Sequence, residues 1–596
     1  MLRFIKGAAG TGKSTFIRRE IAKLCAEDGA NVILLVPEQF SFETEREYYE
    51  FLGAERAGRV KVLSFMRLCD DVFRQYGGMA GDYATDTAKI LTMRLSLKEC
   101  GDELRLYGKN AGKPDFVLSM LETVEELKNA GITPDMLTTE ALRSEEGLLK
   151  DKLFDLGLIY GGYDAMLTQR FLDPSDTLNR AKAFIVEHHY FAGCTLYLDE
   201  FKSFTAVQKE ILRTAFLQAH EVTVSLCLPE GEQEYGLFDG LKETEKGLKS
   251  LAFRVGCRLL PTVVLEKSMR FSSEALCHFA GEALKSNPLP FKGKNESVTC
   301  VGLLNEFDEV EYAAAQIWEL VQKNSYRFED IVVIGRDLDS YGHILEAAFD
   351  RYQIPYFFDR TESVDSMLLM RLVTHLLGCV VTNMSRKELL PMLKCGLLPI
   401  TLTEIDDFER YLYVWNVDRD GFSREFTQNP MGFCDRPLKK KEQLRLKNAE
   451  KVRVLCADCV GSLRRVAEEE QSVSRALYEI LQQLNVPQVI LERISRFKEE
   501  QRLEEAENEK RVWDVLMEIL DTLEGSLQGQ APNFREYKEL FLLSAATYDL
   551  GHRPQTLDSV LVGSAERVRV QDKKAAILIG ANDKVFPFVP SSGGLF

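Results

Sequence analysis

Short apolar runs alternate with longer amphipathic stretches in two parts of the chain. A short apolar run bounded by glycine or polar residues predicts a buried strand, and apolar positions spaced three and four apart predict a helix. The predicted strands cover residues 2–6, 31–36, 60–65, 195–199, 222–228, 297–304, 331–335, 557–563 and 575–579. Strands that alternate with helices in this way are typical of parallel α/β layers.

Two other parts of the chain, from about residue 80 to 185 and from about 370 to 545, show long helical periodicity and acidic stretches. The simplest arrangement is two α/β domains, each interrupted by a helical insertion. The predicted ranges are 1–80 plus 186–262 for the first domain, 81–185 for its insertion, 263–370 plus 546–596 for the second domain, and 371–545 for its insertion. The last predicted strand is not followed by the usual crossover helix, so we expect the chain to be an incomplete piece of a longer protein.

Composition narrows the class of protein. The 596 residues include 75 Lys and Arg against 92 Asp and Glu, a net charge of −17, so any contact with nucleic acid has to come from a local groove. The 13 cysteines have no regular spacing, which favours reduced thiols over a disulfide framework. No apolar stretch reaches the roughly 20 residues that span a bilayer, and the N-terminus lacks a secretory signal. We therefore expect a cytoplasmic protein with no membrane partner.

The clearest chemical signal follows the first predicted strand. Residues 7–14 match the pattern GxxxxGK[ST], between a strand and an amphipathic stretch, which is the context that a phosphate-binding P-loop requires. Its glycines let backbone N–H groups approach phosphate oxygens while the following helix points its N-terminus at the charge. The candidate nucleotide-binding residues are Gly7, Ala8, Ala9, Gly10, Thr11, Gly12, Lys13 and Ser14. Lys13 would bridge the β- and γ-phosphates and Ser14 would hold Mg²⁺; the alternative is a plain glycine-rich turn.

A P-loop that hydrolyses a nucleotide needs a carboxylate site at the end of a neighbouring strand. The run 195–201 provides one, because four strand residues are followed by Asp199 and Glu200. Asp199 would bind Mg²⁺ through water, Glu200 would orient or deprotonate the attacking water, and Gln208 is a possible sensor of the phosphates. Taken alone, the same residues could form a solvated turn.

Single-stranded DNA is usually held by aromatic rings that stack on bases and by scattered cations. The candidates are Phe40, Phe42, Phe65 and Arg67, which follow strands of the first domain, where this fold places its ligands. The alternative is that these side chains belong to the core. The cationic run 436–441 could contact phosphates, although a solvated start of a helix is the simpler interpretation.

The order of these segments resembles a known family. The P-loop, the runs VPEQFSFET at 36–44 and VLSF at 62–65, and DEFKSFTAVQ at 199–208 resemble the first motor domain of superfamily 1 helicases of the UvrD type, and within that group they look most like the AddB family. Residues 265–271 resemble the motif whose arginine, here Arg270, reaches the γ-phosphate from the second motor domain. The downstream segments that resemble the second motor domain are 331–336, 354–359, 562–569 and 577–587.

The resemblance implies an α/β fold with two RecA-like P-loop domains, whose parallel sheets are each interrupted by a helical insertion. It implies a B subunit that binds ATP and Mg²⁺, pairs with an AddA-like helicase/nuclease subunit, and acts on single- and double-stranded DNA at double-strand breaks for homologous recombination, with recognition of Chi. Asp199, Glu200 and Arg270 would be its catalytic residues. Full-length members carry a nuclease domain with a 4Fe–4S cluster, whose cysteines we expect outside this chain.

Two departures from the family pattern affect activity. Many AddB-type chains lack the second carboxylate of the Asp-Glu pair, whereas this sequence keeps Glu200, so hydrolysis is chemically possible. Met269 stands where helicases usually carry an aromatic residue, which argues against strand separation by this protein. A catalytically silent scaffold that binds DNA and its partner is therefore an alternative, and turnover separates the two. A P-loop small-molecule kinase is disfavoured by the length of the chain beyond the P-loop and by the duplicated α/β pattern.

Overall fold

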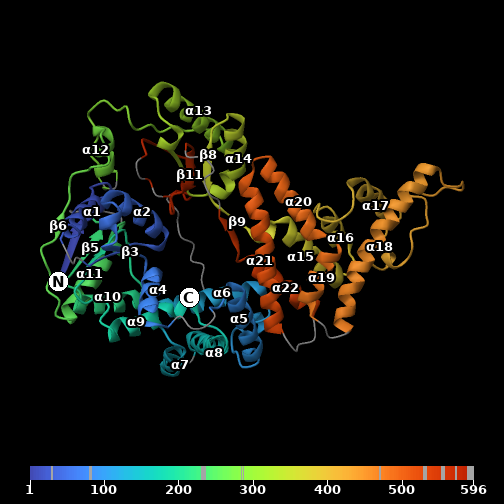
Figure 1. The fold of residues 1–596 in the computed structure, drawn as a ribbon, viewed down its shortest axis with the longest axis horizontal. Coiled ribbons are helices and arrows are strands. Elements are labelled where there is room, and N and C mark those ends of the chain that lie inside the picture. The colour runs from blue at the N-terminus through green and yellow to red at the C-terminus, as the bar shows by residue number, and fades with distance from the viewer. Residues whose placement is uncertain are drawn as a thin grey trace. The chain divides into compact units, whose positions relative to one another are not determined.

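The computed structural model describes residues 1–27, 31–78, 83–145, 147–229, 236–283, 285, 287–468, 472–527, 533–551, 558–568, 570 and 573–586. Strands and helices alternate around parallel sheets, so the predicted α/β class is confirmed (Figure 1). The chain divides into two compact units: Met1–Ala84, Ser96–Asn110 and Ser119–Val301 form the first, and Thr85–Leu95, Ala111–Leu118 and Gly302–Phe596 form the second. Among the described helices, none combines the length and the apolar character needed to cross a bilayer.

The first unit is built on a six-stranded sheet in the order β3-β2-β4-β5-β1-β6, with all neighbours parallel. Its strands are β1 (Leu2–Lys6), β2 (Val32–Leu35), β3 (Val60–Leu63), β4 (Thr195–Leu198), β5 (Glu221–Leu226) and β6 (Val263–Val264). Strand β2 is apolar and buried along its whole length, as is typical of a central strand with both faces covered. On β1, Phe4 packs in one core cluster with Leu196, and the next residue, Ile5, packs in another with Ile17.

Helices connect these strands and fill the first predicted insertion. They are α1 (Lys13–Leu24), α2 (Ser41–Leu52), α3 (Ala54–Ala57), α4 (Phe65–Tyr76), α5 (Asp86–Cys100), α6 (Pro114–Asn129), α7 (Pro134–Arg143), α8 (Leu148–Thr168), α9 (Thr177–Glu187), α10 (Ala206–Gln218), α11 (Asp239–Arg254) and α12 (Glu274–Glu282). Polar side chains fix their ends: the hydroxyl of Ser64 accepts the backbone N–H of Arg67 and starts α4.

The second unit contains a parallel sheet in the order β12-β7-β11-β8. Its strands are β7 (Ile331–Gly335), β8 (Tyr356–Asp359), β11 (Val560–Ser564) and β12 (Ala575–Leu578). In Figure 1, β11, in red, lies beside β8, in yellow-green, although the whole second helical region separates them in the sequence. Helices α13 (Glu306–Asn324) and α14 (Leu338–Arg351) share a core cluster with this sheet. The short strands β9 (Thr361–Ser363) and β10 (Asp549–Gly551) pair antiparallel.

The second helical region has a core of its own. Its helices are α15 (Leu368–Val381), α16 (Arg386–Leu393), α17 (Leu402–Val414), α18 (Lys440–Glu468), α19 (Val473–Gln483), α20 (Val486–Glu499), α21 (Leu503–Leu527) and α22 (Phe534–Ala545). Leu377, Phe408, Leu463, Leu516 and Phe541 come from five of these helices, are fully buried, and belong to one cluster. The region therefore folds around side chains of α15, α17, α18, α21 and α22 rather than around a sheet.

Two details differ from the sequence-based expectations. Residues 297–304 do not form a strand; Val301, Leu303 and Leu304 are exposed, so their apolar pattern has no core to face. Strand β6 begins at Val263, the first residue assigned to the second domain, yet it pairs with β1 of the first sheet. The remaining predicted domain boundaries stay predictions. Leu557, Arg569 and the run 587–596 lie outside the described residues.

Candidate nucleotide-binding site

The loop of residues 7–12 joins the buried strand β1 to helix α1. Gly10 and Gly12 have φ angles of 78° and 81°, a left-handed conformation that glycine adopts without strain. Gly12 is also the N-cap of α1, and no side chain caps this end of the helix. The first N–H groups of an α-helix lack partners within the helix, so the turn presents backbone donors and the positive end of the helix dipole to an anion.

Lys13, the first residue of α1, reaches back over the loop. Its Nζ donates hydrogen bonds to the carbonyl oxygens of Gly7 at 3.0 Å and Ala8 at 2.8 Å. The Thr11 hydroxyl also donates to the Ala8 carbonyl, at 2.9 Å, which keeps the loop curled. The ammonium group is thus held among the same loop atoms whose N–H groups would meet phosphate oxygens. Ser14 follows in the first turn of the helix and is half-buried.

A neighbouring segment packs closely on this loop. The backbone N–H groups of Met269 and Arg270 donate to the Gly10 carbonyl at 2.7 and 3.1 Å. A Cβ at Gly10 would lie 2.8 Å from the Cβ of Arg270, and one at Gly7 would lie 2.4 Å from the Leu265 carbonyl oxygen. The close approach explains why the loop needs glycine here as well as at the turns.

The same contacts correct the expected origin of Arg270. The resemblance places this arginine on the second motor domain, but its segment follows β6, which is the edge strand of the first sheet, and lies against the P-loop within the first unit. The reason is local: the Leu265 N–H donates to the Lys6 carbonyl at 2.8 Å, which extends the β6 pairing toward the loop. Arg270 is exposed.

Asp199 lies at the carboxyl end of β4 and is 7% exposed. One carboxylate oxygen accepts the Ser225 hydroxyl, from β5, and the backbone N–H of Glu200, the latter at 3.0 Å. Burial and the nearby charge of Asp199 together raise the pKa of Tyr48. Glu200 has a φ of 65°, which is strained for a residue with a Cβ and is typical of functional sites. Strand β5 separates β4 from β1, so both turns leave the same edge of the sheet.

Gln208 is placed in the capping box of α10. Its side-chain oxygen accepts the Thr205 N–H at 3.0 Å, and its own N–H donates to the Thr205 hydroxyl at 3.3 Å. A phosphate-sensing role for Gln208 stays a prediction, since its side-chain oxygen already serves the start of a helix.

The predicted DNA contacts are not equivalent. Phe65 is 5% exposed and packs edge-to-face on Phe201, with ring centroids 5.6 Å apart, so it belongs to the core and does not offer a ring for stacking. Phe40, in the short helix η1 (Glu38–Phe40), is half-buried, whereas Phe42, in the first turn of α2, is 78% exposed. Arg67 forms an ion pair with Glu45 at 2.7 Å.

The structure also contains a charged cluster that no sequence pattern predicts. The Lys128 ammonium lies 2.8, 2.6 and 2.9 Å from carboxylate oxygens of Asp164, Asp173 and Asp176, and the lysine side chain is 1% exposed. In the described part of the chain, this aspartate trio is the one grouping of three or more His, Cys, Asp or Glu with metal-site spacing. Lys128 supplies the cation there, so the cluster is an ion-pair network. Lys128 lies 36 residues before the nearest of the three aspartates, so no local spacing could have signalled that a lysine occupies the site.

The residues at the P-loop fit a nucleotide with its magnesium ion. The uncapped start of α1 and the crowded glycines suit a phosphate chain that approaches the backbone closely. The hydroxyl of Ser14 and the carboxylate of Asp199 are oxygen donors, which Mg²⁺ prefers together with several waters.

Comparison with known proteins agrees with the family resemblance seen in the sequence. Residues 4–280 match the family model described as ADDB, N-terminal. The chain is 31% identical over 621 residues to the B subunit of the ATP-dependent helicase/deoxyribonuclease of Clostridium tetani, and 30% identical over 607 residues to that of Clostridium acetobutylicum. Each alignment covers 100% of this chain and 53% of the relative. The chain spans about half the length of the curated relatives it matches.

Proposed function

We propose, from the premise that this chain belongs to the AddB family, that it is the ATP-binding, helicase-like part of the B subunit of a heterodimeric ATP-dependent helicase/deoxyribonuclease. Such a protein would pair with an AddA-like subunit in the cytoplasm, act on single- and double-stranded DNA at double-strand breaks, and recognise Chi during homologous recombination. The nuclease activity and its 4Fe–4S cluster would belong to the part of the relatives that this chain does not cover.

One observation carries the ATP-binding part of the proposal. The P-loop sequence lies between a buried parallel strand and a helix whose N-terminus no side chain caps, and Lys13 is bonded across the loop. A plain glycine-rich turn, the alternative, would not need three glycines in contact with a second segment, because glycine in an open turn only relieves backbone strain. The arrangement therefore supports phosphate binding.

The residues around the loop would each have a different role in ATP hydrolysis. Bound Mg²⁺ would neutralise charge on the phosphates, and Ser14 and Asp199 would hold it. Ser225 fixes the orientation of the Asp199 carboxylate. Glu200 would deprotonate the attacking water, and Arg270 would bind the γ-phosphate from the segment that packs on the loop.

Steady-state ATP turnover, with and without single-stranded DNA, tests the proposal. We expect DNA-stimulated turnover in the wild type, and its loss in Lys13→Ala because the phosphates lose their cation. Glu200→Gln should retain ATP binding but lose turnover, since the amide cannot accept the proton from water. Turnover that survives both substitutions would contradict the assignment of this site.

A silent scaffold is the second candidate, and the Gln208 capping box favours it. If the side-chain oxygen of Gln208 stays with Thr205, it cannot report on the γ-phosphate. The scaffold predicts ATP binding that depends on Lys13 together with no turnover under any DNA condition.

A further inference from the structure

We propose that the start of α18 and the loop before it form a binding surface for single-stranded DNA, separate from the P-loop unit. The cationic surface comprises residues 436–451, which run from the loop into the first turns of α18, together with the shallow cavity beside them. The inference deepens the proposed function, because it rests on DNA as the substrate of this chain.

The net charge of the cationic surface is opposite in sign to that of the whole protein. Residues 436–451 contain seven Lys and Arg and two Glu, a net charge of +5, in a chain whose net charge is −17. A local reversal of this kind attracts phosphate groups that the rest of the molecule repels.

Part of this charge is already used within the fold. Arg436 pairs with Glu442 at 2.6 Å, and Lys451 pairs with Glu404 at 2.6 Å. Arg445 lies 3.4 Å from a carboxylate oxygen of Asp407. These contacts hold the loop and α17 against α18.

Four lysines remain, and the side chain of Lys439 lies near the Glu442 carboxylate, whereas the other three are directed to solvent. Lys440, Lys441 and Lys447 are exposed, and none forms an ion pair within the described residues. Lys440 and Lys441 stand in the first turn of α18, where a positive side chain opposes the helix dipole. Folding therefore does not explain them. From Lys440 to Lys447 the helix rises by about 10 Å, a distance that roughly three phosphates of a stacked strand cover.

The surface is held in place before any ligand arrives. The Glu442 carboxylate is nearly buried and accepts both terminal guanidinium nitrogens of Arg436, at 2.9 and 2.6 Å, and the Lys439 backbone N–H at 2.8 Å. The Arg436 contact is the main reason that the pKa of Glu442 falls to about 2. An ordered surface loses less conformational entropy on binding than a flexible tail does.

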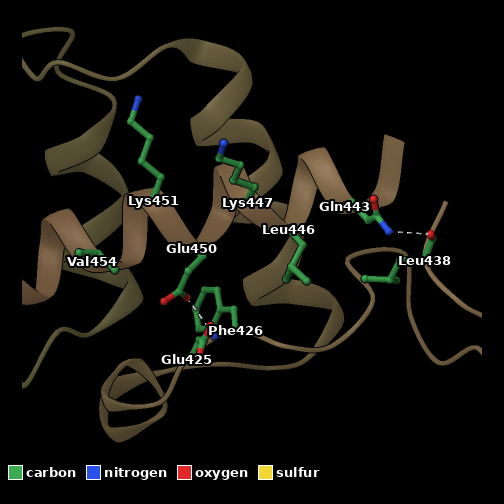
Figure 2. A pocket seen from close by; sticks show the side chains of 9 residues that line it. All are labelled: Glu425, Phe426, Leu438, Gln443, Leu446, Lys447, Glu450, Lys451 and Val454. Carbon is green, nitrogen blue, oxygen red and sulfur yellow. Dashed lines mark hydrogen bonds between the residues drawn. The ribbon is translucent and has the colours of Figure 1, made fainter. Parts of the chain in front are cut away.

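A cavity with an apolar wall beside the lysines favours a single strand over a duplex. The cavity has a volume of about 530 Å³, and its apolar lining residues are Phe426, Leu438, Leu446 and Val454. Its polar lining residues are Gln443, Lys447, Lys451, Glu425 and Glu450, and the Glu450 carboxylate is occupied by the Phe426 N–H and by Arg453. Figure 2 shows these two lysines side by side on the same side of α18. Bases of a single strand are available to apolar walls, whereas a duplex keeps them stacked inside.

An exposed aromatic ring stands close to the cavity in the sequence. Phe433 is 84% exposed and lies in the loop that leads into α18, five residues before Leu438 of the cavity, so the proposal assigns its ring to stacking on a base of the bound strand. Base-on-aromatic stacking is the usual partner of such cations in single-strand binding.

The test compares binding of a fluorescent 30-nucleotide mixed-sequence single strand and the matching duplex over a series of salt concentrations. In the triple variant Lys440→Ala, Lys441→Ala and Lys447→Ala, we expect the single-strand affinity to fall on the order of tenfold at 0.1 M salt. The slope of log affinity against log salt should become shallower by about 2, since about 0.7 counterions are released per phosphate contact. Duplex binding should change less.

A control variant matches the loss of charge. Lys387→Ala, Lys498→Ala and Lys510→Ala removes three exposed lysines of the same unit that form no ion pair within the described residues, and should leave the single-strand slope unchanged. Phe433→Ala should weaken single-strand binding at least about fivefold with the slope unchanged, because stacking carries no counterion release. Thermal unfolding of each variant verifies that it is folded.

Three results would overturn the inference. The first is an unchanged slope in the lysine variant. The second is an equal loss of duplex and single-strand binding. The third is that binding of a polyglutamate peptide depends on the three lysines while binding of the single strand does not. This result would make an acidic protein segment the ligand. If the wild type binds no DNA at all, the DNA part of the proposed function fails too, whereas ATP binding through Lys13 is measured separately and would stand.

Discussion

The turns β1–α1 and β7–α14 both lead from a buried parallel strand into a helix, yet they end in opposite ways. At β1–α1 the N-cap is Gly12, and no side chain satisfies the first N–H groups of the helix. At β7–α14 the N-cap is Asp337, whose carboxylate accepts the Ser340 N–H at 3.4 Å and its hydroxyl at 2.9 Å. A strand, turn and helix in this order offer an anion site only where no carboxylate of the chain caps the helix.

The cations next to the two turns differ in the same sense. Lys13 bonds to carbonyl oxygens of its own loop, while Arg336, the residue after β7, pairs with Glu566. The second turn is therefore neutralised by acidic residues of its own unit, and the first keeps its positive charge for a ligand.

The largest expected effect comes from giving the first turn the cap of the second. Gly12→Asp would place a carboxylate at the N-terminus of α1 and repel phosphates, so ATP affinity should fall at least about 100-fold. Gly12→Asn is the matched control, because both residues tolerate a positive φ and have the same size. Equilibrium binding of a fluorescent ATP analogue measures both. Equal affinities for the two variants would show that the open helix end does not bind the phosphates.

Obstructing the close approach between the loop and the segment of Arg270 should have the next largest effect. Gly10→Ala adds a Cβ 2.8 Å from Arg270 at a φ of 78°, and Gly193→Ala adds one at a φ of 70° with nothing within 4 Å. Both should lose about 1–2 kcal/mol of unfolding free energy from the backbone, and Gly10→Ala about 1–3 kcal/mol more from crowding. Urea unfolding gives the difference. Identical losses would mean that the segment of Arg270 does not constrain the loop.

Mg²⁺ binding by Asp199 can be weakened without substituting Asp199 itself. Ser225→Ala removes the hydroxyl that bonds to Asp199, so half-maximal ATP binding should need about tenfold more Mg²⁺. Thr223→Ala, on the same strand, removes a hydroxyl that contacts Arg3 instead and should leave the Mg²⁺ requirement unchanged. A shift of the same size in both variants would point to a general effect on β5.

The smallest effect is expected at the second turn. Asp337→Ala should lower the free energy of unfolding by about 1 kcal/mol, because α14 loses its cap, and ATP affinity should not change. Asp339→Ala, two residues along in the same helical turn, should cost only a few tenths of that energy. Thermal unfolding compares the two, and a change in ATP affinity at Asp337 would contradict the assignment of a single nucleotide site.

Local patterns predicted much of the fold because local forces decide it. Residues 2–6 and 331–335 are short apolar runs before a turn and a helix, and both form buried parallel strands. The run 297–304 carries a similar pattern but remains exposed, because a strand also needs neighbours to pair with. Strand β6 has only two residues, too few for any periodicity to appear.

Contacts between distant residues could not be predicted in the same way. Phe65 follows a strand, as a ligand-binding residue often does, yet its ring is buried against Phe201. The position of Arg270 on the P-loop depends on the pairing of β6 with β1, which no nearby residue reveals. The glycines at 7, 10 and 12 were predictable as a motif, but the segment that crowds Gly7 and Gly10 was not.

The central claim is that the open turn at β1–α1 binds the phosphates of ATP, and calorimetric titration of Mg²⁺–ATP tests it most directly. We expect saturable one-site binding in the wild type and in Lys23→Ala, which removes an exposed lysine from the last turn of the same helix. Lys13→Ala should bind at least about 100-fold more weakly, because the loop loses its charge-assisted contact with the phosphates. Equal binding by all three proteins would contradict the account.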